Sequence, residues 1–85
     1  MKSHTLTYKV LLHKAEEGGF TVTVPALRGC ITEGDSLDDA LAMAKEAIEL
    51  YVEELQSRGE DIPDDSETLE YSMNLEMAWT FPQGH

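Results

Sequence analysis

Residues 36–59, SLDDALAMAKEAIELYVEELQSRG, form the stretch around which the rest of the chain can be placed. Apolar residues recur in it at spacings of three and four, which is the period of one face of an α-helix. This stripe consists of Leu37, Leu41, Ala44, Ile48, Val52 and Leu55, with Ala40, Ala47 and Tyr51 beside it. The spacing predicts an amphipathic helix of about 33 Å, long enough to cover one face of a small sheet.

Both ends of the predicted helix carry residues that stabilise helix termini. Ser36 is suited to accept a hydrogen bond from the free amides of the first turn, and Asp38 and Asp39 place negative charge at the positive end of the helix. Arg58 suits the opposite pole, and Gly59 suits the left-handed conformation that follows many helices. The helix is therefore expected to begin and end within this stretch.

Three short strands are predicted before the helix, at residues 5–14, 20–24 and 30–33. Apolar and polar residues alternate in the first two, and a glycine pair at 18–19 separates them, which indicates a hairpin of half-buried strands. The second strand is expected to stop at Pro25, because proline cannot donate a ladder hydrogen bond. Gly29 marks a bend before the third strand, and Gly34 with Asp35 turns the chain into the helix.

A fourth strand is predicted after an acidic connector at 60–67. Apolar residues occupy every second position there: Leu69, Tyr71, Met73, Leu75 and Met77. The expected fold is therefore α+β with the order β-β-β-α-β, a three-stranded antiparallel meander plus a fourth strand, with one long helix on one sheet face. The odd-numbered residues of the fourth strand should pack under the helix. Residues 1–77 are interpreted as one domain and 78–85 as a tail, and the exposed sheet edges predict pairing with another copy.

The composition restricts the class of function. Six basic and seventeen acidic residues give a formal net charge of −11, which disfavours unaided binding to nucleic acid or to an anionic membrane and favours basic partners. The acidity is equally compatible with a role in solubility alone. Cys30 is the single cysteine, so no internal disulfide can form, and no apolar run reaches the length of a signal peptide or a membrane span. These features predict a soluble, cytoplasmic protein.

Residues suited to catalysis or metal binding are not gathered in the sequence. A two-metal nuclease needs carboxylates that converge from neighbouring strands, but the stretches 5–14 and 20–24 contain no acid. The histidines, His4, His13 and His85, are too far apart to be presumed neighbours. A lone Cys30 fits packing beneath the helix better than a role as nucleophile. The sequence therefore predicts no catalytic residue, no metal site and no cofactor.

Over residues 6–77 the chain resembles the HicB family of antitoxins. The resemblance is carried by one contiguous register of proline, glycines, cap and helix: Pro25 to Leu27, Gly29, Cys30, Thr32, Gly34, Asp35, Ser36, Ala40, Ala44, Ala47 and Ile48. It implies a partial, degenerate ribonuclease H-like fold, in agreement with the predicted order of elements.

The resemblance implies a function in protein recognition. A member of this family is expected to bind a small basic RNA-cleaving toxin of the HicA type and to cover its active site, as the antitoxin of a type II toxin–antitoxin module. Many members add a C-terminal DNA-binding domain, for which residues 78–85 leave no room, so direct DNA binding by this chain alone is not expected. The candidate interface with a toxin consists of Glu46, Glu49, Glu53, Asp61, Asp64 and Asp65. An ordinary solvated surface is an equally good interpretation of any one of these acids.

Two other functions remain open. An orphan scaffold module would keep the fold without a toxin, and it predicts a stable homo-oligomer, a dimer or tetramer, whether or not a partner is present. A residual metal-dependent nuclease would bind Mg²⁺ or Mn²⁺ and degrade RNA, which calorimetry with either cation would test.

Overall fold

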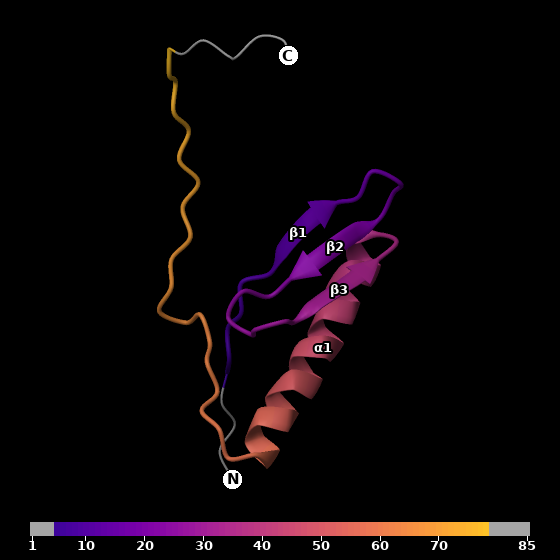
Figure 1. Cartoon of the computed structure of the whole chain (residues 1–85), viewed down its shortest axis with the longest axis vertical. Coiled ribbons are helices and arrows are strands. Elements are labelled where there is room, and N and C mark those ends of the chain that lie inside the picture. The colour runs from indigo at the N-terminus through magenta and orange to yellow at the C-terminus, as the bar shows by residue number, and fades with distance from the viewer. Residues whose placement is uncertain (1–4, 79–85) are drawn as a thin grey trace.

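The computed structural model describes residues 5–78 and consists of a three-stranded antiparallel sheet with one long helix across one of its faces (Figure 1). The strands are β1 (Leu11–Lys14), β2 (Phe20–Thr23) and β3 (Ile31–Gly34), and the helix is α1 (Leu37–Ser57). β2 lies between β1 and β3, which are therefore the two edges of the sheet. The predicted α+β class, the meander and the single long helix are confirmed.

The register of the sheet sorts the side chains onto two faces. Leu12, Val22 and Thr32 stand opposite one another across the three strands, on the face that α1 covers. Val22 is fully buried there against Ala40. The next row of side chains points to the other face, which is open, and Ile31 is exposed on it.

β1 is much shorter than the stretch that predicted it, β2 ends one residue earlier than predicted, and β3 is shifted by one residue. Pairing between β1 and β2 ends at Leu11 and Thr23. Val24 then turns away, and its N–H donates to the Cys30 carbonyl oxygen at 3.0 Å. Residues 5–10 consequently extend beyond the reach of β2.

α1 begins and ends as the sequence predicts. Ser36 is the N-cap residue, and its Oγ accepts a hydrogen bond from the Asp39 N–H at 3.1 Å. Arg58 is the C-cap residue, and Gly59 follows it with a left-handed φ of 68°. In the part of the chain that the structure describes, no helix is both long and apolar enough to cross a bilayer.

In the first half of α1, small residues rather than leucines face the sheet. Ala40 and Ala44 are buried, whereas Leu37 and Leu41 are 49% and 41% exposed. The reason is that α1 packs on β3 and β2 but not on β1, and it approaches β3 so closely at Gly34 that only small side chains fit between them. The prediction that the apolar stripe of the helix covers the sheet is thus wrong for these two leucines, which remain beside the sheet.

The loop between β2 and β3 supplies the second half of the core. Val24, Leu27 and Cys30 are buried and pack against the C-terminal half of α1. Burial raises the pKa of the Cys30 thiol. The prediction that Cys30 packs beneath the helix is confirmed.

The fourth strand predicted at 69–77 is not part of the sheet in residues 5–78. This stretch is extended but pairs with no strand, and its apolar side chains are exposed, from 94% for Leu69 to 65% for Met77. A turn closed by the hydrogen bond from the Thr68 N–H to the Asp65 carbonyl oxygen, at 3.0 Å, leads the chain away from the sheet (Figure 1). Alternation shows that a segment suits a sheet, but it forms a strand only where a free edge lies within reach.

Two predictions from the sequence stay open. The ribonuclease H-like relationship depends on the fourth strand and remains a prediction. The domain boundary between residues 77 and 78 also remains a prediction, because the expected tail lies outside the described residues from position 79 onwards.

Candidate functional site

Potential metal ligands are dispersed in the described part of the chain. Among residues 5–78, no three side chains of the histidine, cysteine, aspartate and glutamate types lie together in a group that could hold a metal ion. His13 lies on the exposed strand β1, and Cys30 lies in the core. His4 and His85 lie outside the described residues.

The acids that the sequence predicts as a partner interface separate into two groups. The first is exposed on the outward side of α1 and just after it: Glu46, Glu49, Glu53 and Asp61. Within this group Glu49 also pairs with Lys45, whose Nζ lies 3.3 Å from Oε2 in a solvent-exposed contact. Such a pair contributes little to stability and can be broken by a stronger partner. The second group, Asp64 and Asp65, is half-buried.

Asp64 and Asp65 tie the connector to the residues that lead into β1. The Thr7 N–H donates to Asp64 Oδ2 at 3.3 Å, and the Lys9 N–H donates to Asp65 Oδ2 at 2.9 Å. The Asp65 N–H donates in turn to the Thr7 carbonyl oxygen at 2.7 Å. These two acids therefore have a structural role within this chain, which the sequence pattern of a solvated connector does not reveal.

The acid stability of the fold is expected to depend on Asp64. Hydrogen bonds from the main chain and hydroxyl of Ser66 and from the Thr7 N–H hold the pKa of Asp64 below its ordinary value of 3.8. Because the pKa is lower in the folded state, the stabilisation is complete above the unfolded-state pKa and is lost as the pH falls through the folded-state pKa. Asp64→Asn should therefore lower the urea midpoint at neutral pH, and the difference from wild type should narrow during acidification below pH 3.8.

The matched control for this titration is Asp61→Asn, which neutralises an exposed acid in the same connector. Its urea midpoint at neutral pH should stay close to that of wild type, because Asp61 is exposed. A difference between wild type and Asp64→Asn that does not narrow in acid would contradict the role assigned to the Asp64 carboxylate.

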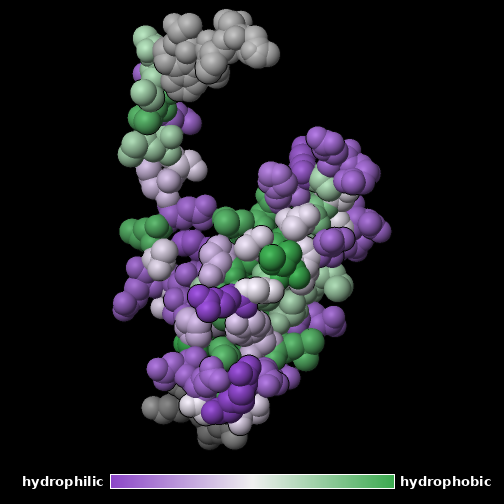
Figure 2. All heavy atoms as spheres, in the orientation of Figure 1, coloured by the Kyte–Doolittle hydropathy of each residue, from purple (hydrophilic) through white to green (hydrophobic). Residues whose placement is uncertain are grey.

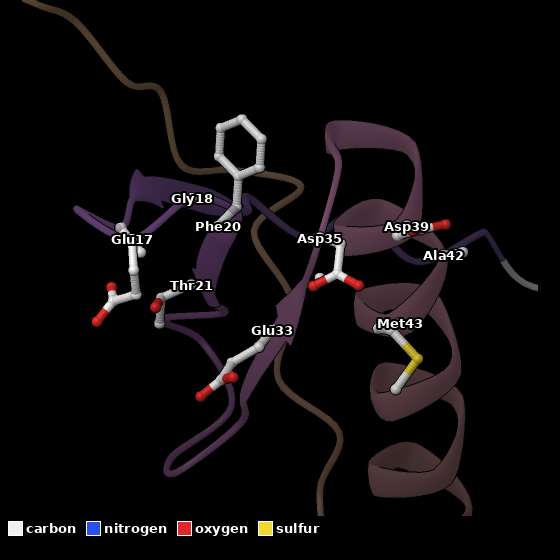
Figure 3. A pocket seen from close by; sticks show the side chains of 11 residues that line it. Glu17, Gly18, Phe20, Thr21, Glu33, Asp35, Asp39, Ala42 and Met43 are labelled. Carbon is white, nitrogen blue, oxygen red and sulfur yellow. The ribbon is translucent and has the colours of Figure 1, made fainter.

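A second acidic surface lies at the N-terminal end of α1. Four carboxylates line an open hollow of about 730 Å³: Glu17, Glu33, Asp35 and Asp39. Figure 3 shows Glu17 beside the β1–β2 turn, Glu33 on β3, Asp35 between β3 and α1, and Asp39 with Met43 on α1. No lysine or arginine is among the side chains that line this acidic hollow. Its negative potential is suited to a basic group on a partner.

The acidic hollow is not evident from the sequence because its residues serve three different local structures. Glu17 belongs to a turn, Glu33 to a strand, and Asp35 and Asp39 to the start of a helix. The close packing of α1 on the end of β3 brings them together. In the view of Figure 2, hydrophilic residues gather at both ends of the folded body, with apolar side chains visible between them.

Comparison with known proteins relates this arrangement to a family. The model of a family described as the HicB-like antitoxin of bacterial toxin–antitoxin systems matches residues 8–80. This chain belongs to the HicB-like antitoxin family.

Relatives of this HicB-like chain occur in archaea and bacteria. A UPF0150 protein of Thermoplasma acidophilum is 44% identical over 61 residues, which cover 72% of this chain and 88% of that protein. A UPF0150 protein of Synechocystis is 41% identical over 56 residues, covering 66% of this chain and 71% of that protein. Antitoxin HicB 1 of Photorhabdus laumondii is 38% identical over 53 residues, which cover 58% of this chain but 34% of that protein. The similarity to this antitoxin thus concerns about a third of its length.

The motif residues of this HicB-like chain mostly have structural positions. They are Pro25, Gly29, Cys30, Gly34, Asp35, Ser36 and Gly59. The first three belong to the loop beneath α1, where Gly29 has a φ of 77°, and Ser36 and Gly59 stand at the two ends of α1. Asp35 is the charged member of the set and lies in the acidic hollow. The motif therefore mainly specifies how α1 is joined to the sheet.

Proposed function

We propose that this chain is the antitoxin of a type II toxin–antitoxin pair and neutralises a small basic RNA-cleaving toxin of the HicA type by direct protein contact in the cytoplasm. The observation that carries the proposal is the family match over residues 8–80. The similarity to antitoxin HicB 1 of Photorhabdus laumondii supports it. A net charge of −11 suits a basic partner whose own surface must hold RNA.

The acids on the outward side of α1 are the proposed contact surface. Glu46, Glu49 and Glu53 are exposed and lie within two turns of one helix, with Asp61 after its end. A single exposed ion pair contributes about 0–1 kcal/mol, so the surface acts through several charges together. Charges of one sign also accelerate encounter with a basic toxin and repel acidic proteins. In this role the chain covers a toxin and performs no catalysis itself.

Asp64 and Asp65 remain in the proposed interface with a smaller contribution. Their carboxylate oxygens already accept hydrogen bonds from the residues that lead into β1. A toxin would therefore interact with the solvent-exposed part of these two carboxylates. The acidic hollow is the alternative contact surface, because it holds four carboxylates without a neighbouring base.

Co-expression with the product of a gene for a small basic toxin of the HicA type tests the proposal. Wild type is expected to relieve growth arrest caused by that product and to co-elute with it. Reversal of three charges in Glu46→Lys/Glu49→Lys/Glu53→Lys should weaken the complex about tenfold or more, since each reversal removes one attraction and adds one repulsion. Titration calorimetry at low and physiological salt measures the effect.

The matched control reverses three exposed acids outside both acidic surfaces, in Glu67→Lys/Glu70→Lys/Glu76→Lys. It changes the net charge equally and should retain affinity within about threefold. Equal weakening by the two triple variants would show that net charge alone matters and would exclude α1 as the interface. A wild-type chain that neither binds the toxin nor relieves growth arrest would overturn the proposed function.

A further inference from the structure

The flank of α1 that faces β1 is open in the first half of the helix. Leu12 of β1 and Leu41 of α1 are 37% and 41% exposed, although Leu12 lies on the sheet face that carries the helix. Ile48 lies two turns after Leu41 on the same flank. We call this surface the β1 groove, and it comprises Leu6, Tyr8, Leu12, Leu41, Ile48 and Val52. Four of these residues, all but the two leucines at 12 and 41, line a hollow of about 320 Å³ together with Glu49 and Glu53 of the proposed toxin surface.

The edge of β1 beside this groove presents main-chain groups to a further strand. Leu11 and His13 direct their main-chain groups to β2, because bonded pairs alternate along the ladder and the Ala15 N–H donates to the Gly19 carbonyl oxygen at 3.1 Å in the same register. The main-chain groups of the intervening residues, Leu12 and Lys14, therefore point to the free edge, as do those of Tyr8 and Val10 in the extended chain before β1. No strand within residues 5–78 pairs with them. An edge of this kind is a template for another extended segment.

Residues 69–77, which we call the exchange segment, have the pattern that this edge requires. Five large apolar side chains occupy its odd-numbered positions, and all five are exposed by 65% or more. Figure 2 shows apolar atoms on the arm that leads to the grey C-terminal residues. At about 3.3 Å per residue the segment is about 30 Å long, enough to run beside residues 7–14.

We propose that the exchange segment of one copy adds as a strand to the β1 edge of a second copy, with its odd-numbered apolar side chains covering the β1 groove. The even-numbered residues, which include Glu70 and Glu76, then face the open side of the sheet. A shift of the register by one residue would place these acids in the groove. The odd-numbered residues must therefore face the groove. Each copy carries one segment and one groove, and a two-fold pair therefore satisfies both and closes.

The geometry favours a second copy over the segment's own β1 edge. The connector is bound to Thr7 and Lys9 through Asp65. The turn from Asp65 to Thr68 follows at once and directs the exchange segment away from its own sheet (Figure 1). A chain of 85 residues that left both the segment and the groove in water would expose an unusually large apolar area. The exchange removes both surfaces from water together.

The oligomeric state of the full chain tests the proposal. Wild type should sediment as a dimer, at twice the chain mass of 9.5 kDa. Tyr71→Asp/Met73→Asp places charges on the apolar side of the segment and should raise the dimer dissociation constant about 100-fold or more. The matched control, Ser72→Asp/Asn74→Asp, places the same charges on the polar side and should leave the constant within about threefold. Because these side chains lie outside the folded body, circular dichroism should show unchanged helix in both variants.

A photo-crosslinking residue at position 73 identifies the occupant of the groove. The expected product is a covalent dimer in which residue 73 is joined to a peptide from β1 or from the first half of α1. Leu41→Asp, which places a charge in the β1 groove, should abolish this covalent dimer. A monomeric wild type, equal dissociation of the two double variants, or a crosslink within one chain would each overturn the proposal. None of these measurements uses a toxin, so their outcome is independent of the proposed function.

Discussion

Gly34→Ala is expected to lower the free energy of unfolding by about 3 kcal/mol, a large fraction of the stability of so small a domain. A Cβ atom on residue 34 would lie 2.8 Å from the Asp39 carbonyl carbon and closer still to the main chain of Ala40. Both are main-chain atoms of the first turns of α1. The overlap can therefore be relieved only by moving the helix away from the sheet, which would also open the contact between Ala40 and Val22.

Gly29→Ala is the matched control for this prediction. A Cβ atom on residue 29 would meet nothing within 4 Å, but the φ of 77° is unfavourable for alanine. The free energy of unfolding should therefore fall only by the conformational cost of alanine in the left-handed region, about 1–2 kcal/mol. Urea denaturation of both variants against wild type measures the difference. If Gly34→Ala is no less stable than Gly29→Ala, α1 does not rest on the main chain of β3 as described.

Leu27→Ala should lower the free energy of unfolding by about 2–5 kcal/mol. Leu27 is 1% exposed and packs with Val24 and Cys30 against α1. Its loop is held by main-chain hydrogen bonds of 3.0 Å from Leu27 to Val24 and from Cys30 to Leu27. A loop fixed in this way cannot collapse into the space that the side chain leaves. The loss of free energy of unfolding should therefore lie toward the upper end of this range.

Leu50→Ala provides the comparison at an exposed position. Leu50 lies on α1 with 62% of its surface exposed, and its truncation should change stability by about 0.5 kcal/mol or less. Equal urea midpoints for the two leucine variants would show that the loop between β2 and β3 is not part of the core. A large loss for Leu27→Ala alone would confirm that the loop substitutes for a longer sheet beneath the second half of α1.

Local signals account for the parts of the fold that were predicted correctly. The apolar period of 36–59 and the hydrogen bond from the Asp39 N–H to Ser36 Oγ involve residues within a few positions of one another. The hairpin of β1 and β2 depends on alternation and on a glycine turn. The burial of Cys30 likewise follows from its residue type. The residues that make these interactions lie close together in the sequence, so the sequence pattern alone is enough to recognise them.

The candidate interaction surfaces were predicted less well. Glu46, Glu49 and Glu53 are exposed as their helical spacing indicates. The acidic hollow, in contrast, combines Glu17 with Glu33 and Asp39, which only the approach of α1 to β3 brings together. The hydrogen bonds of Asp64 and Asp65 to the start of the chain bridge more than fifty positions and carry no sequence signal of their own.

The sequence by itself determined the type and order of β1, β2, β3 and α1, because period, caps and turn residues act over a few positions. Only the tertiary structure decided the rotation of α1, which brings Ala40 rather than Leu41 against the sheet, since the glycine at position 34 admits the helix main chain at that point. It also decided that residues 69–77 do not pair with the sheet. Alternation marks them as suited to a sheet, but a strand requires hydrogen-bonding groups from a second segment, and which segment provides them depends on where the turn at 65–68 directs the chain.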